Sequence, residues 1–340
     1  MTYTIISKET FPFSDQKPGT SGLRKTTKTF LQTNYTENYL QAIFNTLKGR
    51  IELGGVTLVV GGDGRYHNKY VIEKILIPMA AANRIAKLII GLNGLLSTPA
   101  ASHLIRKYGA DGGIILTASH NPGGLNFDFG IKFNLSNGGP CTDKVSNELY
   151  NETLQISSYV TVLESMEIDL SEVQNKSYII SENIFTIIVV DSVEQYCKYL
   201  KKIFDFQSLL KMLTGDDGLP PMLVIADAMH GEFIFFTIEF ELVSSSRVEF
   251  WIHEGMFGRK VIEIGSNILH MLQELTISFT MSFTGKVKSY NNSNVMLIIR
   301  DISDIEAPLC KYIKKHWCGK PFANSEDLRE EVENFLRDQP

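Results

Sequence analysis

Strand patterns alternate with helical patterns along the first part of this chain, and this alternation restricts the fold more than any other feature. Apolar runs of strand length lie at 57–60, 87–90 and 114–116. Apolar residues at helical spacing lie between them, at 69–82 and 99–106. Strands separated by helices pair in parallel, because a crossover helix must pack back onto the sheet. The sequence therefore predicts a doubly wound α/β fold with a mainly parallel sheet and helices on both faces.

The same patterns divide the chain into three parts. We predict a first α/β domain over residues 1–190 and the start of a second, incomplete α/β domain over 191–231. In the second part a helical pattern covers 193–210, and a short apolar strand covers 222–226. Clean alternation is lost over 232–340, where we predict an irregular C-terminal region.

Charge and composition narrow the classes of partner. The 340 residues carry a formal net charge of −5, which argues against binding to nucleic acid or to an anionic membrane surface. No apolar run approaches the ~20 residues of a transmembrane span, and residues 1–10 lack the basic flank and apolar core of a signal peptide. The 4 cysteines form no C-x-x-C pair, which is typical of reduced thiols. We therefore expect a cytoplasmic protein.

The run I-I-L-T-A-S-H-N-P-G-G at 114–124 carries the strongest chemical signal. Ser119 stands just past the carboxyl end of the predicted strand, where open α/β sheets bind their ligands. The small residues around it leave room for a phosphate, and the Asn-Pro and Gly-Gly pairs turn the backbone sharply. Ser119 is therefore a candidate nucleophile, although such a serine can also be only a turn former. His120 can hold or move a proton, or simply bond to backbone.

The octapeptide T-A-S-H-N-P-G-G resembles the phosphoserine loop of the α-D-phosphohexomutases, most closely that of the phosphoglucomutases. Other motifs agree with the family in order and spacing. They are K-P-G-T-S-G-L-R at 17–24, V-V-G-G-D-G-R at 59–65, N-G-L-L-S-T-P-A at 93–100, G-I-K-F-N at 130–134, V-D-S-V-E at 190–194 and D-A-M-H-G at 227–231. The resemblance covers residues 1–231 and implies the first phosphohexomutase domain followed by part of the second.

The resemblance also implies roles for individual residues. Ser119 is the serine that carries the transferred phosphate, and His120 and Lys132 join it as catalytic residues. Thr20 and Arg24 contact the substrate together with these three, and an arginine suits bidentate contact with phosphate. The alternatives are that Lys132 is only a solvated lysine on a strand and that Arg24 is only a solvated arginine in a loop. The implied partner is a small phosphosugar, with Mg²⁺ bound through the phosphate on Ser119 and with glucose 1,6-bisphosphate as activator.

The chain departs from the family at several places. We find no counterpart of the family's D-x-D-G-D-R magnesium loop, of its G-E-E-S-F-G sugar-reading loop or of its C-terminal R-L-S-G-T-G phosphate loop. Phe127 stands where the family usually has glycine, and we expect its ring to crowd the active-site strand. The missing loops are those that would bind the cation and enclose the sugar.

Two functions therefore stay open. The first is a truncated phosphoglucomutase-like enzyme, weakly active or inactive, that moves a phosphoryl group between glucose 1-phosphate and glucose 6-phosphate. The second is a non-catalytic remnant, from a fusion or a gene-model fragment, that binds a phosphosugar or a partner. Residues 314–340 weakly resemble the C-terminal end of mariner-type transposases, or form an ordinary amphipathic surface helix, and neither interpretation predicts transposase activity.

Overall fold

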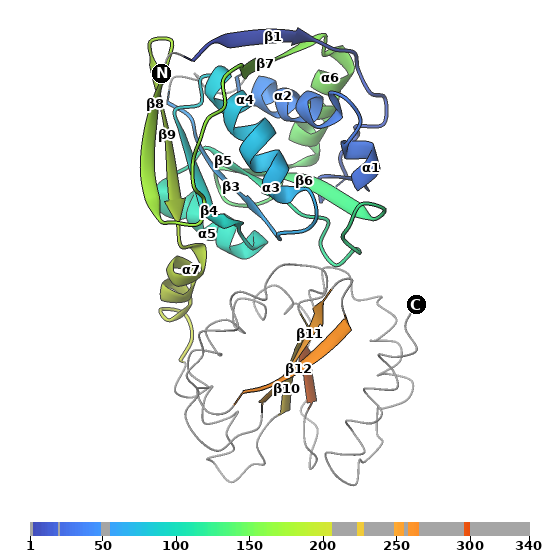
Figure 1. The fold of residues 1–340 in the computed structure, drawn as a ribbon, viewed down its shortest axis with the longest axis vertical. Coiled ribbons are helices and arrows are strands. Elements are labelled where there is room, and N and C mark those ends of the chain that lie inside the picture. The colour runs from blue at the N-terminus through green and yellow to red at the C-terminus, as the bar shows by residue number, and fades with distance from the viewer. Residues whose placement is uncertain are drawn as a thin grey trace.

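The computed structural model (Figure 1) describes residues 3–19, 21–48 and 55–205, together with four later strands. These strands are β10 (Leu223–Asp227), β11 (Val248–Glu254), β12 (Gly258–Ile264) and β13 (Met296–Ile299). Several parts of the sequence predictions lie outside the described residues. They are the substrate-contacting residue Thr20, residues 206–210 of the predicted helix, residues 228–231 of the D-A-M-H-G motif and the transposase-like segment 314–340.

Strands and helices alternate over the first part of the chain, as the sequence predicts. In chain order they are β1 (Ile5–Glu9), β2 (Leu23–Thr26), α1 (Thr27–Phe30), α2 (Tyr35–Lys48), β3 (Thr57–Gly62), α3 (Asn68–Tyr70), the π-helical segment η1 (Val71–Leu76), α4 (Ile77–Ala82), β4 (Lys87–Leu95), α5 (Thr98–Tyr108), β5 (Gly112–Leu116), β6 (Asp128–Leu135), α6 (Asp143–Gln155), β7 (Ser158–Val162), β8 (Gln174–Ile180), β9 (Asn183–Val190) and α7 (Ser192–Leu200).

A seven-stranded sheet lies at the centre of this part, in the order β2-β6-β5-β3-β4-β9-β8. Its middle strands β5, β3, β4 and β9 run parallel to one another. β6 and β2 add antiparallel strands at one edge, and β8 adds one at the other. The prediction of an α/β fold with a mainly parallel central sheet is confirmed. The edges are antiparallel because no helix separates β5 from β6 or β8 from β9.

Helices cover both faces of the sheet (Figure 1). β3 connects to β4 through α3, η1 and α4, whereas β4 connects back across the sheet to β5 through α5. Because such crossovers are right-handed, these two connections lie on opposite faces. α2 packs against η1, α4 and α6, while α5 packs on β3, β5 and α7. The direction of connection reverses between β3 and β5, so the carboxyl ends of these two strands form the topological switch point of the sheet.

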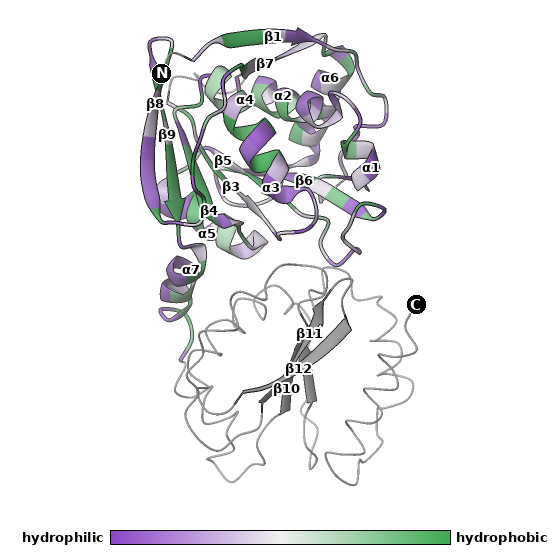
Figure 2. Cartoon of the chain, viewed as in Figure 1, coloured by the Kyte–Doolittle hydropathy of each residue, from purple (hydrophilic) through white to green (hydrophobic). Residues whose placement is uncertain are grey.

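The strands that flank the switch point are buried on both faces. All residues of β5 are buried, as are 58–62 of β3, which explains why these strands read as continuous apolar runs. Figure 2 shows the hydrophobic colouring concentrated on strands such as β4 and β9, with hydrophilic patches on the helices around them. Aromatic side chains of α1 and α2 complete the core on one face, among them Phe30, Tyr35 and Phe44.

The helix predicted over 193–210 is shorter in the structure. α7 begins after Asp191, whose carboxylate accepts a hydrogen bond from the Glu194 N–H at 2.8 Å, and it ends at Leu200. The next residues, 201–205, are exposed, with Ile203 at 53%. These side chains are thus exposed rather than packed, and packing rather than propensity holds most protein helices together. The prediction that the helix continues past Leu200 to 205 was wrong.

The later strands form one sheet of their own, in the order β12-β11-β10-β13. β10 pairs in parallel with β11 and β13, and β11 pairs antiparallel with β12. β10 corresponds to the predicted strand 222–226, whereas the other three strands come from the region without a clear sequence pattern. The boundaries 1–190, 191–231 and 232–340 stay a prediction. Within the described parts of the chain, no helix is long and apolar enough to cross a membrane.

We predict that Gly62→Ala lowers the free energy of unfolding by about 1–3 kcal/mol, the usual cost of overpacking. A Cβ at Gly62 would come within 2.3 Å of the Leu116 carbonyl oxygen and 2.4 Å of Asn68 Nδ2. Gly55→Ala is the matched control, since a Cβ there meets nothing within 4 Å. Urea unfolding followed by circular dichroism measures both variants. Equal stability of the two would contradict the close approach of β3 and β5 at Gly62.

We also predict that His103 makes the packing of α7 on α5 sensitive to acid. Its ring stacks on Tyr199 with centroids 4.3 Å apart. Burial, with the charges of Lys107, Arg106 and Lys202, lowers the pKa of His103 from 6.5 to about 4. The folded state therefore binds this proton less readily than the unfolded chain does, so stability is lost as the pH falls from 6.5 towards 4.

The variant His103→Gln isolates this effect, because glutamine does not titrate. The stability of the unsubstituted protein, measured relative to the variant, should fall between pH 7 and pH 4.5 in urea unfolding. A difference that is independent of pH over this range would show that His103 titrates alike in the folded and unfolded states.

Candidate functional site

Ser119 lies where the sequence predicts it, in the loop that follows β5 at the switch point. β5 ends at Leu116, and the Asp63 N–H at the end of β3 donates to the Leu116 carbonyl at 3.1 Å. The backbone of Ser119 has a φ of 58°, in the left-handed region that residues other than glycine seldom adopt. Such a conformation costs roughly 1–3 kcal/mol and persists only where neighbouring contacts hold it.

A buried ion pair occupies the adjacent turn after β3. Arg65 Nη2 lies 2.8 Å from Asp63 Oδ2, and the exposed fractions of the two side chains are 2% and 15%. Arg65 Nε donates to both carboxylate oxygens of Asp63 at 3.0 Å, and the Arg65 N–H donates to Oδ1 at 3.2 Å. Asp63 therefore neutralises Arg65 and fixes the plane of its guanidinium group.

The remaining donors of Arg65 bind the serine loop itself. Nη2 donates to the Ser119 carbonyl at 2.8 Å, and Nη1 donates to the carbonyls of Asp128 at 2.8 Å and Asn121 at 3.3 Å. Asn121 Nδ2 in turn donates to the Asp128 carboxylate at 2.7 Å. One arginine therefore ties both ends of the loop between β5 and β6 to the turn after β3.

Thr117 completes this set of contacts. Its hydroxyl donates to Asp63 Oδ2 at 2.6 Å and accepts a hydrogen bond from the Ser119 N–H at 2.9 Å. The Thr117 N–H donates to the Gly130 carbonyl of β6 at 2.9 Å. Thr117 thus binds the backbone N–H of Ser119, and Arg65 binds its carbonyl. The two hydrogen bonds together hold the left-handed conformation of this residue.

Arg24 and Lys132 approach the serine loop from β2 and β6. In the sheet register Arg24 stands opposite Gly130, and Lys132 stands opposite Ile115. A Cβ at Gly130 would lie 2.4 Å from the Thr117 carbonyl oxygen and 3.2 Å from Arg24 Cγ, so Arg24 packs beside the start of the loop. Residues two apart on one strand share a face with those directly opposite, which puts Arg24 and Lys132 on one face of the sheet.

The substrate loop of the sequence prediction lies over the same strands. Gly19 and Gly22 exchange two backbone hydrogen bonds of 3.0 Å, and Gly22 has a φ of +87°. A Cβ at Gly22 would lie 2.4 Å from the Ile131 carbonyl oxygen and 2.8 Å from Lys132 Cα, so only glycine fits there. The structure thus gathers Arg24, Lys132 and the loop around Ser119 at one side of the sheet.

His120 and Phe127 lie in the serine loop with different exposures. His120 follows Ser119 directly and is half-buried. Phe127 is 54% exposed, its carbonyl accepts the Thr27 N–H at 2.7 Å, and it precedes the first residue of β6. The expectation that the Phe127 ring crowds the active-site strand was wrong, because this residue lies before the strand and its side chain is largely in solvent.

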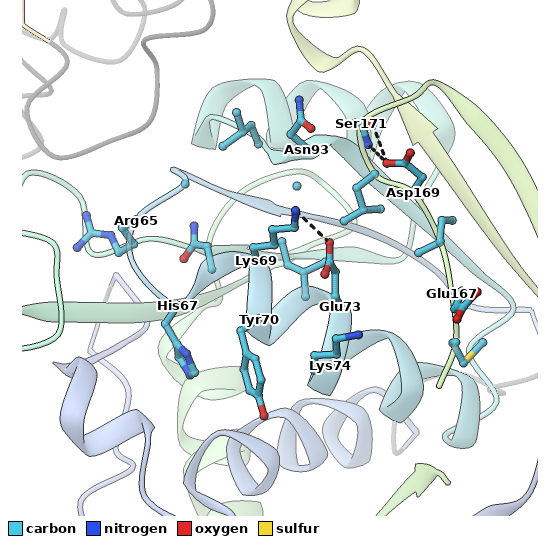
Figure 3. A pocket seen from close by; sticks show the side chains of 18 of the residues that line it. Arg65, His67, Lys69, Tyr70, Glu73, Lys74, Asn93, Glu167, Asp169 and Ser171 are labelled. Atoms are coloured by element: carbon cyan, nitrogen blue, oxygen red, sulfur yellow. Dashed lines mark hydrogen bonds and ion pairs between the residues drawn. The ribbon is translucent and has the colours of Figure 1, made fainter. Parts of the chain in front are cut away.

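A cavity of about 1060 Å³ adjoins Arg65, lined by α3, η1, the end of β4 and residues 166–171 (Figure 3). Three lysines and three carboxylates line it: Lys69, Lys74, Lys176, Glu73, Glu167 and Asp169. Lys69 Nζ lies 3.9 Å from Glu73 Oε1, and hydrogen bonds from Ser171 hold the pKa of Asp169 below its usual range. Because these charges cancel and Arg65 is paired, the lining carries no excess of positive charge for a phosphate.

The residues needed for a complete magnesium site are not gathered in the described ranges. Within them, no group of three or more His, Cys, Asp or Glu side chains is placed to hold a metal ion. Asp63, a carboxylate in the hydrogen-bond network of the serine loop, is committed to Arg65 and Thr117, and the Asp128 carboxylate accepts a hydrogen bond from Asn121. Ser119 and its surroundings therefore do not by themselves fit the oxygen-rich octahedron that Mg²⁺ requires.

Asp63, Arg65 and Thr117 are not among the functional residues that the sequence predicts. The motif V-V-G-G-D-G-R was noted, but its acid and its arginine were assigned no role. A usable signal was present, because both residues follow an apolar strand directly, at the end where α/β sheets build their sites. What the sequence did not reveal is that β3 and β5 are neighbours.

Comparisons with known proteins agree with this geometry. Residues 15–160 match the family described as phosphoglucomutase/phosphomannomutase, alpha/beta/alpha domain I. Phosphoglucomutase 1 of Drosophila melanogaster is 48% identical over 231 residues, which are 68% of this chain and 40% of the fly protein. The cytoplasmic phosphoglucomutase of Pisum sativum is 46% identical over 236 residues, 67% of this chain and 39% of the pea protein. The chain thus spans about two fifths of the length of these relatives.

A solved structure shows the same likeness in three dimensions. The open form of pp63/parafusin, a phosphoglucomutase from Paramecium, superposes with a TM-score of 0.61 at 39% sequence identity. The match covers 67% of this chain and 41% of the Paramecium chain. With its doubly wound sheet and the serine loop at the switch point, the part of this chain at residues 15–160 is domain I of the phosphoglucomutase/phosphomannomutase family, in the phosphohexomutase superfamily.

Proposed function

We propose that this chain carries the phosphoryl-accepting half of a phosphoglucomutase, with Ser119 as the group that takes up and returns the phosphate. One observation carries the proposal: Ser119 stands at the switch point, with both of its backbone polar groups held. This chain is also 46–48% identical to phosphoglucomutases over two thirds of its length. The small-molecule partner is therefore a phosphosugar, and glucose 1,6-bisphosphate is the donor that loads the serine.

The loading step balances as a transfer between two oxygens. Ser119 Oγ forms a bond to the phosphorus of the bisphosphate while the bond from that phosphorus to the sugar oxygen breaks. The hydroxyl proton of Ser119 leaves, and the sugar oxygen gains a proton, so the products are phosphoserine and a glucose monophosphate. When a glucose monophosphate binds in the opposite orientation, its free hydroxyl oxygen forms a bond to the phosphorus while the bond from phosphorus to Ser119 Oγ breaks. The proton of that hydroxyl leaves and Ser119 Oγ regains a proton.

Three side chains serve this step in the proposal. His120 and Lys132 stabilise the transferring phosphate or relay the proton, and Arg24 holds the phosphate that does not react. Arg24 and Lys132 share one face of the sheet beside the loop, which supports these roles. Thr20 belongs with Arg24 in the substrate loop by its sequence position.

Mg²⁺ would neutralise charge on the phosphoryl oxygens, and electrostatic help of this kind is a main source of rate in phosphoryl transfer. The phosphate on Ser119 would be one of its ligands. Since the described residues do not fit a complete site, the steps above use only the side chains of this chain. The name of the pea relative, a cytoplasmic phosphoglucomutase, supports the same location for this protein.

A second function is favoured because the 340 residues contain no counterpart of the family's sugar-reading and magnesium loops. In it the chain binds a phosphosugar, or takes up phosphate on Ser119, without turning over. Turnover distinguishes the two functions, because both of them allow a phosphosugar to bind.

We predict that incubation with labelled glucose 1,6-bisphosphate places label on Ser119 and that Ser119→Ala abolishes it. Ser119 is the serine in the T-A-S-H-N-P-G-G loop at the end of β5. Ser157→Ala is the matched control, since Ser157 is an exposed serine outside the sheet and should leave the label unchanged. Peptide mapping by mass spectrometry locates the phosphate. Label on a different residue, or full label on Ser119→Ala, would refute the proposal.

We further predict that a polypeptide of these 340 residues alone has a turnover number well below about 1 per second, the low end of the ordinary enzyme range. The loops that bind the cation, read the sugar and hold the second phosphate have no counterpart in the sequence, and cooperating groups of this kind are lost as a unit. A coupled assay for glucose 6-phosphate with Mg²⁺ and glucose 1,6-bisphosphate measures it. A turnover number in the range of roughly 1–10³ per second would favour the enzyme over the binding protein.

A further inference from the structure

The two contacts that hold Ser119 meet on one carboxylate oxygen. Asp63 Oδ2 accepts a hydrogen bond from the Thr117 hydroxyl at 2.6 Å and from Arg65 Nη2 at 2.8 Å. Thr117 binds the Ser119 N–H, and Arg65 binds the Ser119 carbonyl. A closed ring of hydrogen bonds therefore runs from Asp63 through Thr117, Ser119 and Arg65 back to Asp63.

None of the Arg65 donors in this ring points to a ligand. A guanidinium group has five N–H donors. In this structure Nε serves the Asp63 carboxylate, Nη2 serves Asp63 and Ser119, and Nη1 serves Asn121 and Asp128. All five donors of Arg65 therefore bind oxygen atoms of the protein, and the Arg65 side chain is 2% exposed.

Thr117 is likewise used within the protein. Its one hydroxyl proton goes to Asp63, and its oxygen accepts the Ser119 N–H. Because the Ser119 N–H donates to Thr117, it is not free to donate to a phosphate on Ser119. Contact with the phosphate then falls to other residues, and the hydrogen bonds from Arg65 and to Thr117 hold Ser119 by its backbone.

We propose that Asp63, Arg65 and Thr117 are positioning residues that hold the Ser119 loop ready for phosphoryl transfer and do not bind the phosphate. This inference rests on the function proposed above. A hydrogen-bonded ring that fixes φ at 58° also fixes the direction of the Ser119 Cα–Cβ bond, and hence where Oγ can stand. Misplacement of a reacting atom by about 1 Å can cost roughly 100-fold in rate.

The inference predicts a slower transfer step at unchanged binding of the sugar. Loading of Ser119 is followed in single turnovers over a range of glucose 1,6-bisphosphate concentrations. For Thr117→Val, which keeps the shape but removes the hydroxyl, the maximal rate should fall about 10–100-fold, and the half-saturating concentration should stay within about threefold. Thr117→Ser keeps the hydroxyl and should restore most of the rate.

The role of Arg65 is tested by the same loading experiment, with one variant at Arg65 and one control variant at another arginine. Arg65→Lys keeps the charge but loses the planar fork, and it should slow loading as Thr117→Val does. Arg106→Lys is the control, because Arg106 lies on α5, where its Nη1 donates to the Asn137 carbonyl at 3.4 Å. Thermal unfolding of every variant shows which of them are folded at the assay temperature.

Three results would overturn the inference. They are loading of Thr117→Val at the original rate, equal slowing of Thr117→Val and Thr117→Ser, and a raised half-saturating concentration at an unchanged maximal rate. The last result would make Thr117 a phosphate ligand.

Hydrogen exchange of the loop 117–128 separates this inference from the proposed function. Exchange should be faster in Thr117→Val and Arg65→Lys, but not in Thr117→Ser or Arg106→Lys. If the unsubstituted protein takes up no label, the proposed function fails while the exchange experiment still tests the ring. Unchanged exchange in Thr117→Val and Arg65→Lys would overturn the positioning role.

Discussion

The buried ion pair between Asp63 and Arg65 is the interaction on which the candidate site depends. Charges taken out of water are stable only when their hydrogen-bonding capacity is filled, and loss of one partner of a buried pair costs about 3–5 kcal/mol. Here the remaining donors of Arg65 bind three backbone carbonyls of the serine loop, those of Ser119, Asn121 and Asp128. The fold and the serine loop are thus stabilised by one set of contacts.

This arrangement is possible only at the point where the sheet reverses its direction of connection. β3 and β5 are neighbours in space, yet α3, η1, α4, β4 and α5 separate them in the chain. Right-handed crossovers send the two helical connections to opposite faces and leave the carboxyl ends of β3 and β5 uncovered. The turn after β3 can then reach the loop after β5, and glycines such as Gly62 let the two backbones approach closely.

Sequence reasoning found what is local and missed what depends on pairing. The parallel central strands, the helices between them and the position of Ser119 follow from apolar periodicity and from turn residues. The ring around Ser119 joins residues 54 apart in sequence, such as Asp63 and Thr117, and no local pattern reports such a pair. The early end of α7 and the outward ring of Phe127 also depend on which surfaces are available for packing, which spacing alone does not give.

The two arginines near the serine loop show why residue type alone does not assign a role. Arg65 is buried and spends every donor on protein oxygens, so it builds the loop. Arg24 lies on the edge strand β2 over Gly130, a position from which a long side chain can reach a ligand beside the loop. A phosphate needs positive charge that is not already neutralised, and a nucleophile needs a backbone that does not move when the phosphate arrives. In the proposed function these two demands fall on separate arginines, so that Arg65 holds Ser119 in position whether or not Arg24 contacts a phosphosugar.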